Sequence, residues 1–546
     1  MALLLLSHKA RPHAHRLRIL LLQCALLSTV TLGCAAGAAS QSRPVEAHAV
    51  GVAKPQSRRA DAARFRRRAE AILAARGPDK GVWGVLVTDA ETGEVLYQRH
   101  ADTLFAPASN AKLFSTALAA ATLGVDFRTR TTIETSGTVD ESGAVHGDVV
   151  LIGRGDPNLS NRKFPYEKKV EREGPPEKAL SELADALVAR GVRHIAGDLI
   201  ADDSFFAATR FPSGWTIDDM LWSYGSAVSA IAVNDNAFTL EIRPADHAGE
   251  PAVYSVEPAS EFYTIENRVQ TVSGPDEANL TVSREPGVRV VRVSGGMLAG
   301  GDARRLSIAI EEPAEYAAAL LARLLEARGV RIGGAVRARH AVDALPGRSD
   351  PSLETVLAER ISLPLAEDIR LVNKNSQNLH AELMLLHAAR QGQGPGTRED
   401  AVKFATEFFK AAGIAEGNVL LSDASGLSRR DLVTPRAVVQ LLAYVETQPW
   451  REFYRSTLPV AGEDGTLAER MKNTRAAGRV LAKTGTVEHV SALSGYATTV
   501  RGSRLIFSIF GNNNSLRAQA ADRVIDAIAV AMVEEIGPPA RARRRR

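Results

Sequence analysis

The sequence predicts an α+β fold in which the two ends of the chain build one sheet and a β-rich excursion separates them. Three observations support this prediction. A helix and a strand hairpin come early, at 62–76 and 82–98. Helices dominate after residue 355, and three strands with a last helix follow at 479–536. Between these parts, residues 127–355 consist mainly of short β-rich runs, which indicates an inserted module.

The early elements have clear boundaries. The helix at 62–76 ends at Gly77-Pro78, a pair that does not continue a helix. The hairpin at 82–98 turns around a Glu-Thr-Gly sequence. The next helix, at 108–124, carries alanine, leucine and phenylalanine at helical spacing and stops at a glycine.

The middle part contains two helices, at 177–192 and 313–330. Both end in Ala-Arg-Gly-Val-Arg and run into a glycine-containing strand. This likeness is either a weak internal repeat or the result of glycine capping at two ordinary helices. The β-rich runs around these helices are 147–153, 194–201, 237–243, 252–256, 279–284, 288–295 and 306–312.

The late part changes from helices to strands. The segment 368–390 is predicted as one helix. Because the three late strands and the early hairpin flank this helical part, we expect them to share one sheet. The other late elements are helices at 397–413, 434–447 and 516–536 and strands at 479–487, 491–500 and 504–512.

The composition excludes several protein classes. The 546 residues are 45% hydrophobic and 24% charged, which excludes a collagen-like, wholly disordered or coiled-coil chain. The formal net charge of +4 is concentrated at the chain ends, because residues 1–38 carry four basic and no acidic side chains and 541–546 hold five arginines. Subtracting these nine charges leaves a body of net charge −5, which offers no basic surface for nucleic acid.

Residues 1–38 have the pattern of an export signal. Basic residues precede an uncharged stretch at 19–42 with small residues at Ala36 and Ala38, which is typical of a cleaved secretory signal peptide. An uncleaved membrane anchor and a lipoprotein signal ending at Cys34 are the alternatives. We therefore expect an exported protein, periplasmic or associated with the cell envelope. The anchor, or the arginine tail, would bring it to a membrane surface.

The flanking segments and the cysteines follow from this prediction. Residues 39–60 are rich in proline, serine and alanine and indicate a linker, and 538–546 indicate a basic disordered tail. Both cysteines of the sequence, Cys24 and Cys34, lie in the predicted signal, so the mature chain has no disulfide and no cysteine nucleophile. The sequence contains no H-E-x-x-H, Walker A or G-x-S-x-G motif. We predict no metal and no cofactor.

Three short motifs carry the candidate chemistry. An S-x-x-K runs from Ser109 to Lys112 at the start of a predicted helix. An S-x-N, formed by Ser376 and Asn378, lies in a helical region, and a K-T-G begins at Lys483 in a strand. Two-letter patterns such as S-x-x-K and S-x-N arise by chance in a chain of this length, and singly each of the three motifs fits a helix cap or a solvated strand residue. All three in order, each in the element that the chemistry requires, indicate a serine acyl-transfer site.

The first motif supplies a nucleophile and a base. Residues i and i+3 share one helix face, so Lys112 can reach the hydroxyl of Ser109. A neutral, desolvated lysine acts as general base and makes the serine nucleophilic. The backbone N–H groups of Ser109 and Thr486 are candidate oxyanion donors.

The other two motifs supply groups for the substrate. Lys483 and Thr484 are suited to hold a carboxylate, and Ser376 to pass a proton to a leaving amine while Asn378 fixes the substrate amide. A second S-x-x-K, which begins at Ser160, lies in a polar, lysine-rich loop and is discarded.

On these motifs the chain resembles the serine D-alanyl-D-alanine carboxypeptidase/endopeptidase family, the class C low-molecular-mass penicillin-binding proteins of penicillin-binding protein 4 type. The resemblance covers about 62–536, and the 267-residue gap from Ser109 to Ser376 matches the long insertion of that family. The segments that resemble the family include LIGRGDPNLS, VNKNSQNLHAELMLL, DASGLSRRDLVTP, LPVAGEDGTLAERM and LAKTGTVEHVSALSGYA.

The resemblance implies a fold and an activity. The fold is a serine β-lactamase/transpeptidase-like domain at 61–126 and 356–537, an antiparallel sheet flanked by helices plus a helical subdomain, with nested β-rich inserted domains at 127–355. The activity is cleavage of the terminal D-Ala of peptidoglycan stem peptides, often with cleavage of D-alanyl cross-links. β-Lactam antibiotics would acylate Ser109 and inhibit the enzyme covalently.

The resemblance also assigns roles to residues. Asp156 and Arg429 match positions that help to bind the free end of the peptide side chain in the family; alternatively they are a turn-former and a surface cation. Glu488 stands where relatives often have a neutral side chain. The motif residues take the family roles of nucleophile (Ser109), general base (Lys112), second motif (Ser376, Asn378) and third motif (Lys483, Thr484, Gly485).

Two rival functions use the same residues differently. A β-lactamase-like hydrolase or amidase would share the chemistry, but the long insertion and the lack of an obvious deacylation glutamate motif argue against it. A non-catalytic wall-binding scaffold would need neither nucleophile nor base.

Overall fold

The computed structural model describes residues 57, 59–75, 77–166, 171–207, 209–341, 355–391 and 396–537. The predicted signal at 1–38, nearly all of the predicted linker and the tail at 538–546 lie outside the described residues. Within the described part, no helix combines the length and the apolar composition needed to span a membrane.

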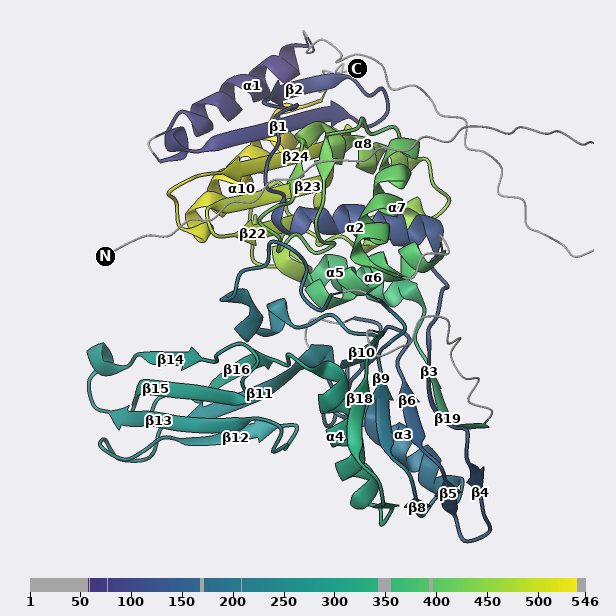
Figure 1. Ribbon diagram of the computed structural model, residues 1–546. Helices are drawn as coiled ribbons and strands as arrows, with labels where there is room; N and C mark the ends of the chain where they lie inside the picture. Colours follow the sequence, from purple (N-terminus) through teal and green to yellow (C-terminus); the bar gives the residue numbers. More distant parts are fainter. Residues whose placement is uncertain are drawn as a thin grey trace, which may run out of the picture. The chain divides into compact units, whose positions relative to one another are not determined.

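A five-stranded antiparallel sheet joins segments from the two ends of the chain (Figure 1). Its strand order is β2-β1-β24-β23-β22, and each strand is antiparallel to its neighbours. The predicted α+β fold is confirmed, and β22, which carries the K-T-G motif, lies at an edge of the sheet. The strands are β1 Val82–Asp89, β2 Val95–Arg99, β22 Val480–Val487, β23 Val490–Thr498 and β24 Arg504–Asn512.

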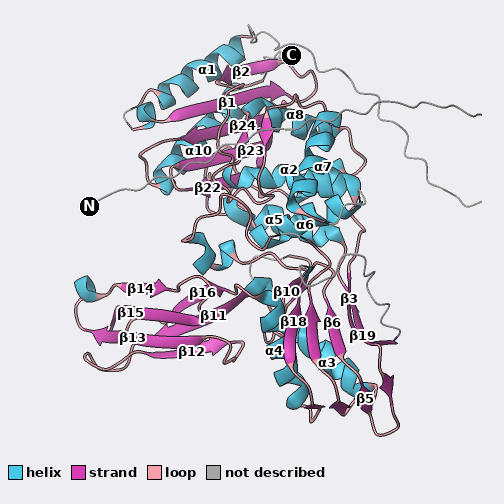
Figure 2. Cartoon of the chain, viewed as in Figure 1, coloured by secondary structure: helices cyan, strands magenta, loops and turns pink. Residues whose placement is uncertain are grey.

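Helices cover both faces of this sheet (Figure 2). Side chains alternate along a strand, so Val85 and Val87 pack with α1 Ala60–Leu73 and α10 Ala518–Glu535, whereas Leu86 packs with the helical subdomain. That subdomain consists of α2 Ala111–Thr122, α5 Leu365–Asn375, α6 Asn378–Gln391, α7 Arg398–Ala411, α8 Pro435–Glu446, α9 Arg451–Thr457 and the small hairpin of β20 Val419–Leu420 and β21 Leu432–Val433.

The single helix predicted at 368–390 is wrong. The chain forms two helices, α5 and α6, which are separated at Ser376. Ser376 has a φ of 63°, a left-handed conformation that cannot continue a right-handed helix. The break places the serine of the S-x-N motif in the short connection between the two helices.

The β-rich excursion has its own hydrophobic core. Its largest sheet has the order β18-β9-β6-β3-β19, and a four-stranded sheet has the order β17-β8-β5-β4. Two three-stranded sheets, β12-β11-β16 and β13-β15-β14, and the pair β10-β7 complete it. Its elements are β3 Arg130–Thr135, β4 Thr138–Val139, β5 Ala144–His146, β6 Val149–Ile152, β7 Asp156–Leu159, α3 Lys178–Ala189, β8 His194–Ile195, β9 Leu199–Asp202, β10 Ile231–Val233, β11 Ala237–Arg243, β12 Val253–Glu257, β13 Thr264–Val272, β14 Leu280–Ser283, β15 Val290–Leu298, β16 Arg304–Ala309, α4 Pro313–Glu326, β17 Arg331–Ile332, β18 Val336–Arg339 and β19 Thr355–Ile361.

The two Ala-Arg-Gly-Val-Arg segments lie side by side. Each follows a helix, α3 or α4, and leads into strands that pair in parallel, β8 with β17 and β9 with β18. The N–H of Arg331 donates to the carbonyl of Arg193 at 3.1 Å. Gly191 and Gly329 have φ values of 93° and 81°. The structure therefore contains features of both explanations. The two helix–strand units pair with each other, as in an internal repeat, and each helix ends at a left-handed glycine, as in glycine capping.

The inserted sheet extends beyond the predicted boundary at residue 355. Strand β19 pairs antiparallel with β3 up to Ile361, and Leu357 and Ala358 lie in the core of the insertion. The first residues assigned to the second catalytic segment therefore belong to a sheet of the insertion.

Candidate active site

Ser109 lies in a single helical turn, Ala108–Asn110, that leads into α2. This turn places residues 109 and 112 on one side of the chain, and Nζ of Lys112 lies 2.8 Å from Oγ of Ser109. The predicted contact within the S-x-x-K motif is therefore present. The side chain of Lys112 is fully buried, whereas Ser109 is partly exposed.

Lys112 is held by two acceptors from distant parts of the chain. Its Nζ donates to Oδ1 of Asn378 and to the carbonyl oxygen of Ser425, each at 2.6 Å. Burial lowers the pKa of Lys112 to about 7, against the charges of the nearby carboxylates of Asp423, Glu382 and Asp431, which raise it. A large fraction of the amine is therefore neutral near pH 7, as a general base requires.

Two buried carboxylates shape the loop that presents the Ser425 carbonyl. Oε1 of Glu382 accepts the N–H groups of Ala424 and Ser425 at 2.9 Å. Asp423 accepts the N–H of Gly426 at 2.7 Å and the indole N–H of Trp215 at 2.8 Å. Sequence reasoning missed this loop because its contribution to Lys112 is a backbone carbonyl.

The amide of Asn378 has a defined orientation. Its Nδ2 donates to the carbonyl oxygen of Tyr224 at 2.7 Å, so its Oδ1 faces Lys112. Tyr224 lies in the insertion, in the short helical turn Ser223–Gly225. The insertion therefore supplies a backbone group to the site, which no residue pattern indicated.

The second and third motifs meet at Lys483. Nζ of Lys483 donates to Oγ of Ser376 at 2.9 Å, and the hydroxyls of Thr484 and Thr466 lie 2.8 Å apart. Burial, followed by the nearby charge of Lys112, holds the pKa of Lys483 well below its usual range. A carboxylate bound beside Lys483 would raise the pKa of its amine again. This cluster is therefore suited to bind an anion.

Strand β22 approaches the nucleophile very closely. A Cβ at Gly485 would lie 2.8 Å from the carbonyl oxygen of Pro107 and 3.1 Å from the N–H nitrogen of Ser109. Only glycine leaves this space free. The next residue, Thr486, is exposed on the edge strand. Backbone groups on the free side of an edge strand have no strand partner and remain available to a ligand.

Asp156 does not line this site. Its side chain is fully buried, accepts the N–H of Asn158 at 2.9 Å and lies 3.6 Å from the guanidinium of Arg360. Burial raises its pKa to about 6. The prediction that Asp156 contacts the substrate is contradicted, because none of its surface is exposed.

Arg429 lies at the exposed side of the site. Its N–H donates to the carbonyl of Gly214 at 3.1 Å, and its side chain is exposed. Burial raises the pKa of Tyr224, and the charges around its phenol include Asp219, Arg429 and Asp218. Arg429 and the exposed Asp218 therefore both lie near Tyr224, and sequence reasoning named only the arginine.

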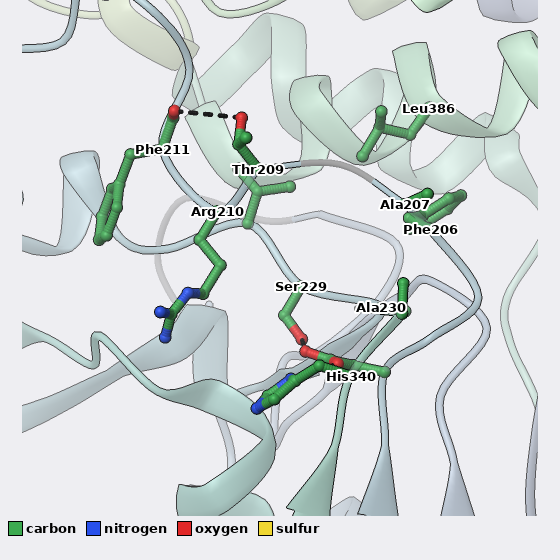
Figure 3. A pocket seen from close by; sticks show the side chains of 12 residues that line it. Phe206, Ala207, Thr209, Arg210, Phe211, Ser229, Ala230, His340 and Leu386 are labelled. Carbon is green, nitrogen blue, oxygen red and sulfur yellow. Dashed lines mark hydrogen bonds and ion pairs between the residues drawn. The ribbon is translucent and has the colours of Figure 1, made fainter. Parts of the chain in front are cut away.

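A cavity of about 590 Å³ lies elsewhere, near the end of β9 and α6 (Figure 3). Phe206, Phe211 and Leu386 form apolar walls, and His340 lies on the other side. None of the predicted site residues lines it.

One group of possible metal ligands exists among the described residues. Ligand atoms of Glu312, Glu315 and His340 lie within 4.8 Å of one another. Each already has a partner: Glu312 pairs with Arg210, Glu315 with Arg289, and His340 with Asp203. Because all three groups are engaged, we assign no metal to them.

Comparison with known proteins agrees with this geometry. The D-Ala-D-Ala carboxypeptidase 3 (S13) family matches residues 67–534. A D-alanyl-D-alanine carboxypeptidase of Actinomadura sp. (strain R39) is 35% identical over 479 residues, which cover 86% of this chain and 84% of that protein. The D-alanyl-D-alanine carboxypeptidase DacB of Haemophilus influenzae is 25% identical, over 80% of this chain and 87% of its own.

A solved structure has the same fold. The crystal structure of penicillin-binding protein 4 (DacB) from Haemophilus influenzae superposes with a TM-score of 0.73 at 24% sequence identity. The match covers 84% of this chain and 97% of that structure, so it includes both the sheet domain and the insertion.

Proposed function

The chain belongs to the D-Ala-D-Ala carboxypeptidase 3 (S13) family, and from this premise we propose how its residues cleave D-Ala-D-Ala. The protein is an exported serine D,D-peptidase that releases the terminal D-Ala of peptidoglycan stem peptides through an acyl-enzyme on Ser109. The observation that carries this proposal is the 2.8 Å contact between Oγ of Ser109 and Nζ of the fully buried Lys112.

Acylation begins with proton transfer from Ser109 to the neutral amine of Lys112. The serine oxygen then attacks the carbonyl carbon of the penultimate D-Ala. The negative charge on the carbonyl oxygen is stabilised by the N–H groups of Ser109 and Thr486, which the close approach of β22 at Gly485 brings together. The Lys112 ammonium is then stabilised by the Asn378 and Ser425 oxygens.

The leaving D-Ala is handled by the Lys483 cluster. Its carboxylate binds beside Lys483 and the hydroxyls of Thr484 and Thr466, where the buried amine lacks a carboxylate partner among the described residues. Ser376 lies 2.9 Å from Lys483, so its hydroxyl passes its proton to the departing amine and takes a proton from the Lys483 ammonium in return. Water then hydrolyses the acyl-enzyme.

The catalytic domain comprises 61–126 and 362–537. This assignment follows the predicted division but moves its second boundary, because β19 pairs with β3 of the insertion up to Ile361. The signal at 1–38 exports the chain, so that the site meets its peptidoglycan substrate outside the cytoplasm.

The free end of the third residue's side chain binds near Arg429. This exposed guanidinium and the carboxylate of Asp218 lie close to Tyr224, beside the catalytic amide of Asn378. A cation and an anion together fit a side chain that ends in both an amine and a carboxylate. We extend the proposal to D-alanyl cross-links, since Arg429 and Asp218 are both exposed.

β-Lactams acylate Ser109 and remain attached. A β-lactamase needs a carboxylate that activates water at the acyl-enzyme. The nearby Glu382 is fully buried, and its oxygens are engaged by two backbone N–H groups and by Arg398 at 2.6 Å. Glu382 therefore holds the loop that contains Ala424 and Ser425, and it is not free to activate water.

The proposal is tested with mature protein and fluorescent penicillin. We expect one adduct per chain, mapped to Ser109 by peptide mass spectrometry, and release of D-Ala from a D-Ala-D-Ala stem peptide. Ser109→Ala removes both signals with an unchanged circular dichroism spectrum. A wild-type protein that takes no label and releases no D-Ala would refute the peptidase, and rapid turnover of penicillin would favour the β-lactamase.

A further inference from the structure

A second cavity begins where the catalytic strand ends. It has a volume of about 470 Å³ and lies between the β22–β23 turn and the segment that leads into α10. Thr486 belongs both to this cavity and to the catalytic strand edge. The described residues that line it are Thr486, Val487, Glu488, His489, Val490, Ser491, Asn514, Ser515, Leu516, Arg517 and Ala518.

The two walls of this cavity are tied to each other. Nδ1 of His489 lies 3.1 Å from the carbonyl oxygen of Asn514, and Nδ2 of Asn514 donates back to the carbonyl of His489 at 3.3 Å. Oδ1 of Asn514 also accepts the N–H of Leu516 at 3.2 Å. The cavity thus lies between two turns that are joined by hydrogen bonds between His489 and Asn514.

The direction in which a substrate crosses β22 follows from the site. The terminal carboxylate lies at Lys483 and Thr484, and the scissile carbonyl lies at the N–H of Thr486. The remaining peptide therefore continues past Thr486 towards Glu488 and His489. An extended peptide advances about 3.3 Å per residue, so the residue two positions before the acylated D-Ala lies about 7 Å further on. That residue is the γ-linked glutamate of the stem peptide, and this binding mode directs it towards the cavity that begins at Thr486.

The charge of the cavity fits the free α-carboxylate of that glutamate. Arg517 is exposed and has no ion pair or side-chain hydrogen bond with any other described residue. The acidic residue of the lining, Glu488, lies 3.6 Å from the ring of His489, and its side chain is 77% exposed. An unpaired guanidinium beside a continuous path from the nucleophile is suited to a carboxylate.

We propose that this cavity is a subsite for the glycan-proximal part of the stem peptide, in which Arg517 binds the free α-carboxylate of the γ-linked glutamyl residue. The proposal rests on the proposed D,D-peptidase function and deepens it. It makes the enzyme sensitive to amidation of that carboxylate, a change remote from the bond that is cleaved. Amidation removes the charge but leaves the length and shape of the peptide nearly unchanged.

Three substrates and two variants test this subsite. The substrates are the pentapeptide with a free glutamyl carboxylate, the same pentapeptide with the amide, and a truncated tripeptide that lacks the glutamyl residue. Arg517→Ala removes the cation. Arg523→Ala is the matched control, because Arg523 is an exposed arginine of α10, the helix that follows Arg517, and does not line the cavity.

We expect kcat/KM of the wild type to be about fivefold higher for the acid than for the amide, the effect of one exposed ion pair. Arg517→Ala should equalise the two pentapeptides and leave the tripeptide and the penicillin acylation rate unchanged. Arg523→Ala should behave as wild type. If Arg517→Ala keeps the wild-type preference for the acid over the amide, the subsite is refuted and the peptidase function is not. The same holds if the variant lowers kcat/KM equally for all three substrates. A wild type that cleaves none of the peptides and takes no penicillin overturns the D,D-peptidase function.

Discussion

The buried amine of Lys112 predicts the pH dependence of acylation. A pKa of about 7, instead of 10.5, means that burial, partly offset by the nearby carboxylates, disfavours the charged amine by about 5 kcal/mol in total. The reactive form is the neutral amine, whose fraction rises with pH. The acylation rate should therefore rise through a midpoint near pH 7, with a fraction of about one half there and about one tenth at pH 6.

The measurement is the second-order rate constant for labelling by fluorescent penicillin between pH 5 and pH 8.5. Penicillin is suitable because its reaction needs no release of a leaving D-Ala. Circular dichroism at each pH establishes that the protein stays folded. Glu382→Gln removes one of the charges that stabilise protonated Lys112, so it should move the midpoint to lower pH.

A variant with a permanent charge supplies the control. Lys112→Arg keeps a cation at every pH used, so it should give no adduct at any pH if the folded spectrum is retained. A wild-type rate that is constant from pH 5 to pH 8.5, or that falls as the pH rises, would falsify the assignment of Lys112 as general base. A rate that still rises about tenfold per pH unit at pH 8.5 would show that burial does not perturb the amine.

Three further variants test separate parts of the structure. Ser376→Ala should lower D-Ala release by about 100-fold or more without moving the midpoint of the pH profile, because it removes a proton carrier and leaves Lys112 in place; steady-state kinetics checks this. Gly485→Ala should lower the penicillin acylation rate by more than about tenfold, since its Cβ would lie 2.8 Å from the Pro107 carbonyl. Asp235→Ala should reduce the free energy of unfolding in urea by about 3–5 kcal/mol, because it removes the buried carboxylate that Arg162 and Arg172 share and leaves Arg162 with Glu171 alone.

Sequence reasoning was strongest where the chemistry is local. The contact of Ser109 with Lys112 follows from an i, i+3 spacing, and the two groups lie 2.8 Å apart. The order of helices and strands was sufficient to predict one sheet from both chain ends. The Ser109–Lys112 contact and the order of helices and strands depend on neighbours in the sequence, and periodicity records such neighbours well.

The missed features depend on partners that are far away in the sequence. The carbonyls of Ser425 and Tyr224 belong to residues of any type, so no side-chain pattern marks them. Asp156 has the residue type of a ligand site, but Arg360 and the surrounding core enclose it. The left-handed Ser376 interrupts a segment of helical periodicity, and its hydroxyl accepts from Lys483, a partner far away in the sequence that no local pattern records.

The insertion takes part in catalysis through the helix that begins at Asn378. One segment of the insertion touches α6 twice: the Tyr224 carbonyl accepts from Asn378, and Oδ1 of Asp235 lies 3.2 Å from Nε2 of His380. The hydroxyl of Ser226 donates to the carbonyl of Asp235 at 3.0 Å and links the two contacts.

Two fixed contacts, two residues apart on α6, prevent the helix start from turning about its axis. The Asn378 amide can then present only its oxygen to Lys112, since its nitrogen is already committed to Tyr224. Because the oxygen accepts a hydrogen bond and the nitrogen does not, this orientation decides whether Asn378 joins the Ser425 carbonyl as an acceptor for Lys112. The insertion between Ser109 and Ser376 therefore contains the segment, from Tyr224 to Asp235, that orients Asn378 towards Lys112.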